Sequence, residues 1–160
     1  KEEWIKVKGD IDSKRKKLPK GKILGLDING TAVQACKVHL RTAGFYDVVK
    51  VASGDLCDYV PEISPDLIIC NPPYGKRIGD EDQLQALYRE LGFVMRSITK
   101  RPGKAFIFTG SMKLSKAFLL KSTKRHVLEN GRMDCRLLEF DFEPKENFVR
   151  KSDKVCDTVS

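Results

Sequence analysis

The sequence has little that would mark a membrane, secreted or metal-binding protein. Its 160 residues contain no apolar run near the roughly 20 residues that span a bilayer, and the Lys/Glu-rich start has no signal-peptide core. The five cysteines include no C-x-x-C pair, and their odd number argues against a disulfide framework or a zinc site. We therefore expect a cytoplasmic protein without a metal, in which the cysteines serve as small apolar residues.

Glycine-rich phosphate-binding loops are also missing, since neither a G-x-G-x-x-G nor a Walker pattern occurs. What is present is a composition of 41% hydrophobic and 32% charged residues, which fits one soluble domain with a real core. The formal net charge is +8, with a basic cluster within residues 14–22. This charge indicates phosphate-bearing partners, although a solvated basic face would look the same.

Short β-branched or aromatic runs bounded by turn residues predict buried strands at residues 22–27, 48–51, 66–70 and 105–109. Helical spacing follows the first strand, where Gly44 would end the helix, and recurs over residues 84–98. Alternating strands and helices predict an α/β fold with a parallel sheet, whose ligands bind at the carboxyl ends of the strands.

The end of the chain predicts an antiparallel hairpin, because Asn130-Gly131 separates extended runs at residues 126–129 and 132–142. Along the second run the apolar positions change phase after Leu137, which indicates either a bulge or a change in the covered face. Residues 144–160 form a polar, aperiodic tail.

The most informative segment is Asn71-Pro72-Pro73-Tyr74, which follows directly on the strand at 66–70. Proline fixes its own φ and biases the preceding residue toward extended backbone, so this loop should be stiff and project from the carboxyl end of the strand. Asn and Pro are also common in ordinary turns, but the position at the end of a buried strand favours a site.

The chemistry that this loop offers is capture of a nucleobase amino group. The Asn71 amide oxygen and the Pro72 carbonyl could each accept one N–H bond, and would then turn the nitrogen toward an electrophilic methyl group. No strong base is required for this arrangement. Tyr74 would supply a ring face on which a flipped base stacks.

Two further strand ends carry carboxylates. Asp27, followed by Ile28, could accept hydrogen bonds from ribose hydroxyls while Ile28 packs on adenine, although Asp27 or Asn29 could instead cap the next helix. Asp55 could accept from the adenine amino group above Leu56, although Gly-Asp is also an ordinary turn pair.

Two basic residues, Lys76 and Arg77, follow Gly75, the residue directly after the loop at 71–74. Because they lie close to the aromatic Tyr74 in the sequence, we expect them to contact a substrate phosphate. The alternative is that both side chains are simply solvated.

Together, residues 25–29, 54–55 and 71–79 resemble the class I, Rossmann-like methyltransferases. The segments 84–92 and 128–132 are similar to one family among them, often found beside a THUMP domain, which methylates guanine N2 in ribosomal or transfer RNA. The likeness covers residues 4–142. It implies S-adenosylmethionine as the cofactor and RNA as the partner. It also implies these site residues: catalytic Asn71, Pro72 and Tyr74; cofactor-binding Asp27, Ile28, Asp55, Leu56 and Asn71; substrate-binding Pro73, Tyr74, Lys76 and Arg77.

The sequence departs from this family in one respect, because no Gly-rich strand precedes the strand at 22–27. We therefore expect residues 1–21 to be a helix and basic linker inserted in a larger domain, 22–143 to be a partial methyltransferase domain, and 144–160 to be the tail. The resemblance places the first strand and a THUMP-type RNA-binding domain outside these residues. An isolated fragment of this kind should be weak or inactive.

Two other functions remain open. Asn-Pro-Pro-Tyr is shared with adenine-N6 methyltransferases that act on DNA or RNA. The absent Gly-rich loop also agrees with a non-catalytic RNA-binding module derived from the same fold.

Overall fold

A computed structural model describes residues 1–74 and 80–144 of the chain. The chain divides into two compact units, Lys1–Tyr59 and Val60–Ser160, which are described separately below. Among the described residues, no helix is both long and apolar enough to cross a membrane.

The first unit contains a parallel pair of strands joined by a helix. Its elements are α1 (Glu2–Ser13), β1 (Ile23–Asp27), α2 (Gly30–Thr42) and β2 (Val49–Ser53). Asn29 caps α2, because its Oδ1 accepts the backbone N–H groups of Thr31 (2.9 Å) and Ala32 (3.2 Å). Beyond the other end of α2, Gly44 has a φ of +76°, which confirms the predicted helix stop.

Helix α1 has no buried residue, so local interactions within the helix hold it. Two ion pairs one turn apart, Lys8 to Asp12 at 2.8 Å and Lys14 to Asp10 at 2.7 Å, bridge its last turns. This helix agrees with the predicted helical start of the chain.

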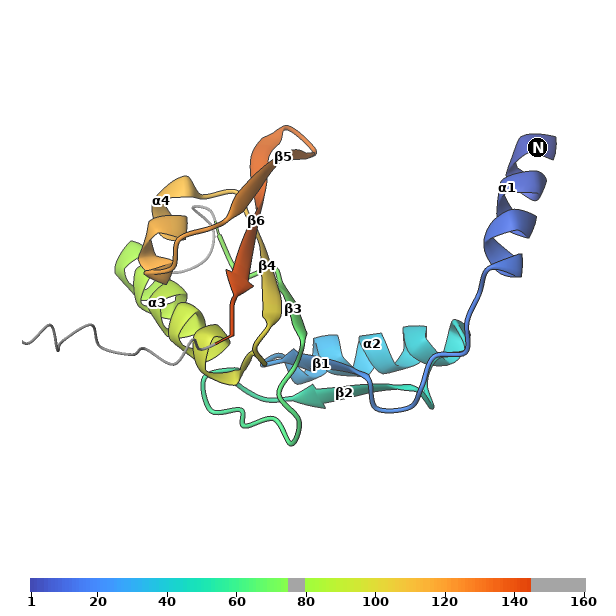
Figure 1. The fold of residues 1–160 in the computed structure, drawn as a ribbon, viewed down its shortest axis with the longest axis horizontal. Helices are drawn as coiled ribbons and strands as arrows, with labels where there is room; N and C mark the ends of the chain where they lie inside the picture. The colour runs from blue at the N-terminus through green and yellow to red at the C-terminus, as the bar shows by residue number, and fades with distance from the viewer. Residues whose placement is uncertain (75–79, 145–160) are drawn as a thin grey trace, which may run out of the picture. The chain divides into compact units, whose positions relative to one another are not determined.

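The second unit is a four-stranded mixed sheet with its helices on one face (Figure 1). The elements, in chain order, are β3 (Leu67–Cys70), α3 (Glu81–Ile98), β4 (Gly103–Thr109), α4 (Met112–Ser115), η1 (Lys116–Phe118), β5 (Lys124–Asn130) and β6 (Met133–Phe142). The strand order is β3-β4-β6-β5, in which β3 and β4 are parallel and β6 is antiparallel to both of its neighbours.

The predicted hairpin is confirmed, with its turn one residue later than expected. Asn130 lies opposite Met133, so the two central turn residues are Gly131 and Arg132, and Gly131 has a φ of +64°. The pairing of β6 with β4 and β5 runs without a skipped residue. The phase change along β6 is therefore a change of the covered face and not a bulge.

The core of this unit lies between α3, η1 and one face of the sheet. Ala105, Ile107 and Thr109 of β4 are buried on that face and lie opposite Phe140, Leu138 and Arg136 of β6. From α3, the fully buried Tyr88 packs its ring 4.8 Å from that of Phe118, which in turn lies 5.8 Å from Phe140. The spacing of apolar residues over 84–98 predicts an amphipathic helix, and the buried apolar side chains of α3 confirm this prediction.

The opposite face of the sheet mixes apolar and charged side chains. Ile69 of β3 is 72% exposed, whereas Glu139 of β6 is buried and paired with Lys104 of β4 at 2.5 Å. Lys104 also reaches Asp141 at 2.6 Å. Because Lys104 donates a hydrogen bond to Glu139, the pKa of this carboxyl is held below its ordinary value, against the opposing effect of burial.

The α/β fold with parallel strands and a C-terminal hairpin agrees with the prediction, and the strands form two sheets. β1 pairs only with β2, and within the described residues no strand pairs with the outer edge of β1 or of β3. Of the described cysteines, Cys135 is buried, Cys57 and Cys70 are half-buried and Cys36 is exposed.

Gly92→Ala should destabilise the second unit. A Cβ on Gly92 would lie 2.2 Å from the carbonyl oxygen of Phe118, which is backbone and cannot rotate away. We expect a net loss of up to about 2 kcal/mol, because overpacking costs ~1–3 kcal/mol and the gain in helix propensity offsets ~1 kcal/mol of this cost. Urea denaturation measures the change. In the matched control Gly9→Ala the new Cβ meets nothing within 4 Å, so stability should not fall.

Acid should weaken the Lys104 cluster. The folded-state pKa of Glu139 lies below its ordinary value, so its contribution to stability is present at neutral pH and is lost as the pH falls through the folded-state pKa. Lys104→Met should therefore lower the free energy of unfolding more at pH 7 than at about pH 3. The exposed pair of Lys100 and Asp66 is the control, and Lys100→Met should show little change at either pH. An equal effect of both substitutions would contradict the role of Glu139.

Candidate functional site

At the carboxyl end of β1, Asp27 is exposed and has one carboxylate oxygen occupied by the local turn. Its Oδ1 accepts the backbone N–H of Asn29 at 2.8 Å. The helix cap is Asn29, so the alternative in which Asp27 caps α2 is wrong. Ile28, the next residue, is 73% exposed. The Asp27 carboxylate and an apolar side chain are thus presented together at this strand end.

Asp55 lies at the same edge of the first unit. Asp27 is opposite Ser53 in the parallel pair, and the backbone N–H of Gly54 donates to the Asp27 carbonyl at 3.1 Å. Asp55 follows directly, is exposed, and accepts the N–H of Cys57 at 2.9 Å. Leu56 is half-buried beside it. The structure therefore brings together the four residues that the sequence predicts for the adenosine part of a cofactor.

In the second unit, Asn71 and Pro72 follow the last residue of β3. Asn71 is exposed and Pro72 is buried. The buried proline anchors the loop, and the exposed asparagine leaves its amide oxygen accessible from solvent. Among the described residues the Asn71 side chain has no hydrogen-bond partner.

Tyr74 packs on the sheet face opposite α3. Its ring lies 6.2 Å from the ring of Phe108, edge to face at 68°, and its hydroxyl is 4.0 Å from the Cys135 Sγ. Gly110 leaves room for this ring, because a Cβ there would lie 2.8 Å from Tyr74 Cε2. The tyrosine is half-buried and keeps part of its ring at the surface.

The end of β4 is held from the other face by a hydrogen bond in the core. The Tyr88 hydroxyl lies 3.1 Å from Thr109 Oγ1, which also accepts the backbone N–H of Ser111 at 3.1 Å. These contacts position Gly110 under Tyr74. Sequence reasoning missed Phe108, Thr109 and Gly110, because only the pairing of β4 with β3 and β6 brings them to the loop.

Cys70, next to Asn71, does not act as a nucleophile. Burial raises the pKa of its thiol to about 11, so it is protonated at neutral pH. The groups that the loop offers are oxygen acceptors and an aromatic ring.

Two predicted residues, Lys76 and Arg77, lie outside the described residues. Pro73, the remaining substrate candidate, is half-buried between Pro72 and Tyr74. Within residues 1–74 and 80–144, no group of three or more His, Cys, Asp or Glu side chains could hold a metal ion.

Comparison with known proteins identifies the family. Residues 1–139 match the family model described as RMKL-like, methyltransferase domain, and the chain belongs to that family. A relative from Allochromatium vinosum, named ribosomal RNA large subunit methyltransferase K/L, is 38% identical over 128 residues. That match covers 78% of this chain and 17% of the relative, so the chain spans about a sixth of the length of its curated relative.

Solved structures confirm the Rossmann-like methyltransferase fold. The methyltransferase SMU.472, in complex with SAH, has a TM-score of 0.69 and 30% identity, and the match covers 78% of this chain and 32% of that one. A predicted N6-adenine-specific DNA methylase from Listeria monocytogenes has a TM-score of 0.61 and 27% identity, with 76% of this chain and 30% of that one covered.

Gly110→Ala should displace the Tyr74 ring without unfolding the protein. The new Cβ would also approach Met133 Sδ to 2.8 Å, and the flexible methionine can move while the tyrosine ring has to leave Phe108. NMR should therefore show the loss of contacts between the rings of Tyr74 and Phe108. Contacts between Tyr88 and Phe118 in the core are the internal control and should persist. Unchanged Tyr74 contacts would show that Gly110 does not seat the ring.

Proposed function

We propose that this chain carries the nucleobase-binding loop of an enzyme that transfers a methyl group from S-adenosylmethionine to an exocyclic amino group in RNA, with guanine N2 of ribosomal or transfer RNA as the target. The observation that carries the proposal is the Asn71 to Tyr74 loop. Asn71 is exposed at a strand end, Pro72 is buried beneath it, and the Tyr74 ring is seated on Phe108. The RNA methyltransferase relative and the family support it.

The role of the loop in this proposal is to activate an exocyclic amine, which is a poor nucleophile. The lone pair of an exocyclic amine is delocalised into the base, and acceptors on both N–H groups favour the tetrahedral nitrogen that forms as it attacks. The Asn71 amide oxygen and the Pro72 carbonyl would provide these acceptors, and they bind the transition state better than the planar amine. Tyr74 would stack on the base and hold its plane.

The residues of the first unit suit the adenosine part of S-adenosylmethionine. The exposed Asp27 carboxylate would accept from ribose hydroxyls, because the local turn uses only its Oδ1. Ile28 and Leu56 would contact the adenine, and Asp55 would accept from its amino group. When bound, the cofactor supplies an electrophilic methyl group.

We further infer that the complete enzyme contributes a strand with a Gly-rich turn and an RNA-binding domain of the THUMP type. The outer edges of β1 and β3, with which no strand of the described residues pairs, support the first inference, since parallel strands are usually paired on both sides. The proposed RNA substrate supports the second inference, and it also supports a location in the cytoplasm.

An adenine-N6 methyltransferase is the second candidate, favoured by the likeness to the N6-adenine methylase structure. Incubating the complete protein with S-adenosylmethionine and unmodified RNA, followed by nucleoside analysis, separates the two. N2-methylguanosine supports our proposal, and N6-methyladenosine contradicts it.

A non-catalytic RNA-binding module is the third candidate. Calorimetric titration of the complete protein with S-adenosylhomocysteine tests it. Saturable binding excludes the module, whereas absence of binding contradicts a methyltransferase.

Asn71→Ala should lower kcat of the complete enzyme roughly 10²–10³-fold with little effect on KM for RNA, as expected for a hydrogen-bonding group that acts in the transition state. The fold should be kept, because the side chain makes no hydrogen bond within the described residues. Asn71→Asp, which keeps oxygen acceptors at the same position, is the matched control and should retain more activity than alanine. Full turnover by Asn71→Ala would exclude the role.

A further inference from the structure

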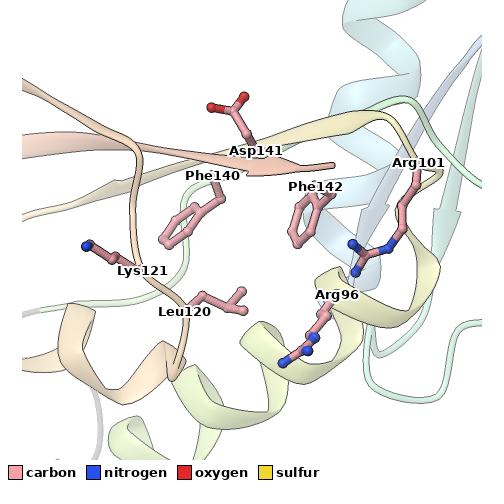
Figure 2. Close-up of a pocket in the computed structure, with 7 residues that line it drawn as sticks. All are labelled: Arg96, Arg101, Leu120, Lys121, Phe140, Asp141 and Phe142. Atoms are coloured by element: carbon pink, nitrogen blue, oxygen red, sulfur yellow. The ribbon is translucent and has the colours of Figure 1, made fainter. Parts of the chain in front are cut away.

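A basic pocket lies in the second unit at the end of the sheet opposite the Tyr74 loop (Figure 2). Its volume is about 190 Å³, and its lining comprises three cations, one acid and three apolar residues: Arg96 of α3, Arg101, Lys121, Asp141, Leu120, Phe140 and Phe142. Phe142 pairs with Gly103, the first residue of β4, whereas Tyr74 contacts Phe108 near its last residue. At roughly 3.4 Å per residue, the two places are about 17 Å apart along β4.

Among the described residues, the cations that line this pocket form no ion pair. Arg96 and Lys121 form no ion pair with any described residue. The carboxylate of Asp141 points away from the two phenylalanine rings, to the other side of β6 (Figure 2), where it binds Lys104 at 2.6 Å. The pocket thus presents three cationic side chains, and the one acid that lines it among the described residues, Asp141, is paired with Lys104.

Arg101 is held in place while its charge remains available. It donates a hydrogen bond to the Glu143 carbonyl at 3.1 Å, and its guanidinium lies 5.6 Å from the centre of the Phe142 ring. A guanidinium positioned in this way is suited to phosphate, because its planar donors match the oxygen pairs of that group.

An exposed aromatic ring lies beside these cations. Phe93 of α3 is 74% exposed and lines an adjoining hollow of about 680 Å³ together with Arg96 and Arg101. A large apolar ring that stays in water next to arginines is the arrangement on which unpaired bases stack while their phosphates contact the cations. A single-stranded nucleic acid fits this surface better than a free anion does, because both features are satisfied together.

We propose that Arg96, Arg101, Lys121 and Phe93 form a second RNA contact, which binds the phosphate backbone and one unpaired base of single-stranded RNA about 17 Å from the methylation loop along β4. This inference rests on the proposed function for the identity of the nucleic acid as RNA. The contact would hold the flank of the substrate while the target base reaches Tyr74.

The test is RNA binding by the chain without S-adenosylmethionine, so that it does not depend on methyl transfer. Fluorescence anisotropy with a labelled single-stranded RNA long enough to span both places is measured at about 0.05–0.2 M salt. The double substitution Arg96→Gln and Lys121→Gln should weaken binding about tenfold and lower the slope of log affinity against log salt by about 1.4, at ~0.7 per phosphate contact.

The matched control removes two charges elsewhere. Lys50 and Lys116 are exposed and have no ion pair among the described residues, so Lys50→Gln with Lys116→Gln changes the net charge equally. A smaller loss for this control supports the pocket. An equal loss for both doubles, or none for the pocket double, overturns it. Circular dichroism verifies that each variant is folded.

A separate measurement tests whether Phe93 stacks on an unpaired base. Phe93→Ala should weaken binding of single-stranded RNA about tenfold and leave binding of duplex RNA unchanged, because paired bases cannot stack on the ring. An equal effect on both RNAs would overturn the role of Phe93.

The two proposals can fail separately. If the complete enzyme methylates no RNA while the double substitution Arg96→Gln and Lys121→Gln still weakens RNA binding, the proposed function fails and the second contact stands.

Discussion

The carboxyl end of β4 joins the core of the second unit to its candidate site. On one face, Tyr88 reaches Thr109 from α3 with a buried hydrogen bond of 3.1 Å. One residue further on, Gly110 lets the Tyr74 ring approach the backbone from the other side. The alternation of side chains along a strand makes this arrangement work, because neighbouring residues face opposite sides of the sheet. The helix that builds the core therefore also determines where the loop tyrosine lies.

The two units contribute different chemistry to the proposed reaction. The first presents carboxylates and apolar side chains at adjacent ends of two parallel strands, which suits the ribose and base of a nucleoside. The second presents neutral oxygen acceptors and an aromatic ring. Neither set includes a strong base, and the thiol beside Asn71 is kept protonated by burial. The division agrees with a reaction in which positioning of the amine contributes more than proton removal before attack.

Charge is distributed unevenly over the two faces of the second unit. On the face opposite α3, Lys104 pairs with both Glu139 and Asp141. On the side of α3, Arg96 and Lys121 have no such partner among the described residues. The alternation along β6 separates them, since Asp141 projects to one side while Phe140 and Phe142 project to the other. The chain has a net charge of +8. In the second unit, strand geometry determines on which face the cations are paired with acids.

The sequence by itself determined the strands, the helices and the hairpin, because alternation, helical spacing and turn residues are local properties of the chain. It also determined the Asn71 to Tyr74 loop and the carboxylates at 27 and 55, since each directly follows a predicted strand. The tertiary structure alone decided that Asn29 rather than Asp27 caps α2, that the phase change in β6 exchanges faces, and that Phe108 and Gly110 seat Tyr74. It also decided which cations remain unpaired. The Asn29 cap depends on the local turn that precedes α2. The other outcomes depend on which residues lie opposite one another across the sheet, and contacts between segments far apart in the chain leave no local pattern in the sequence.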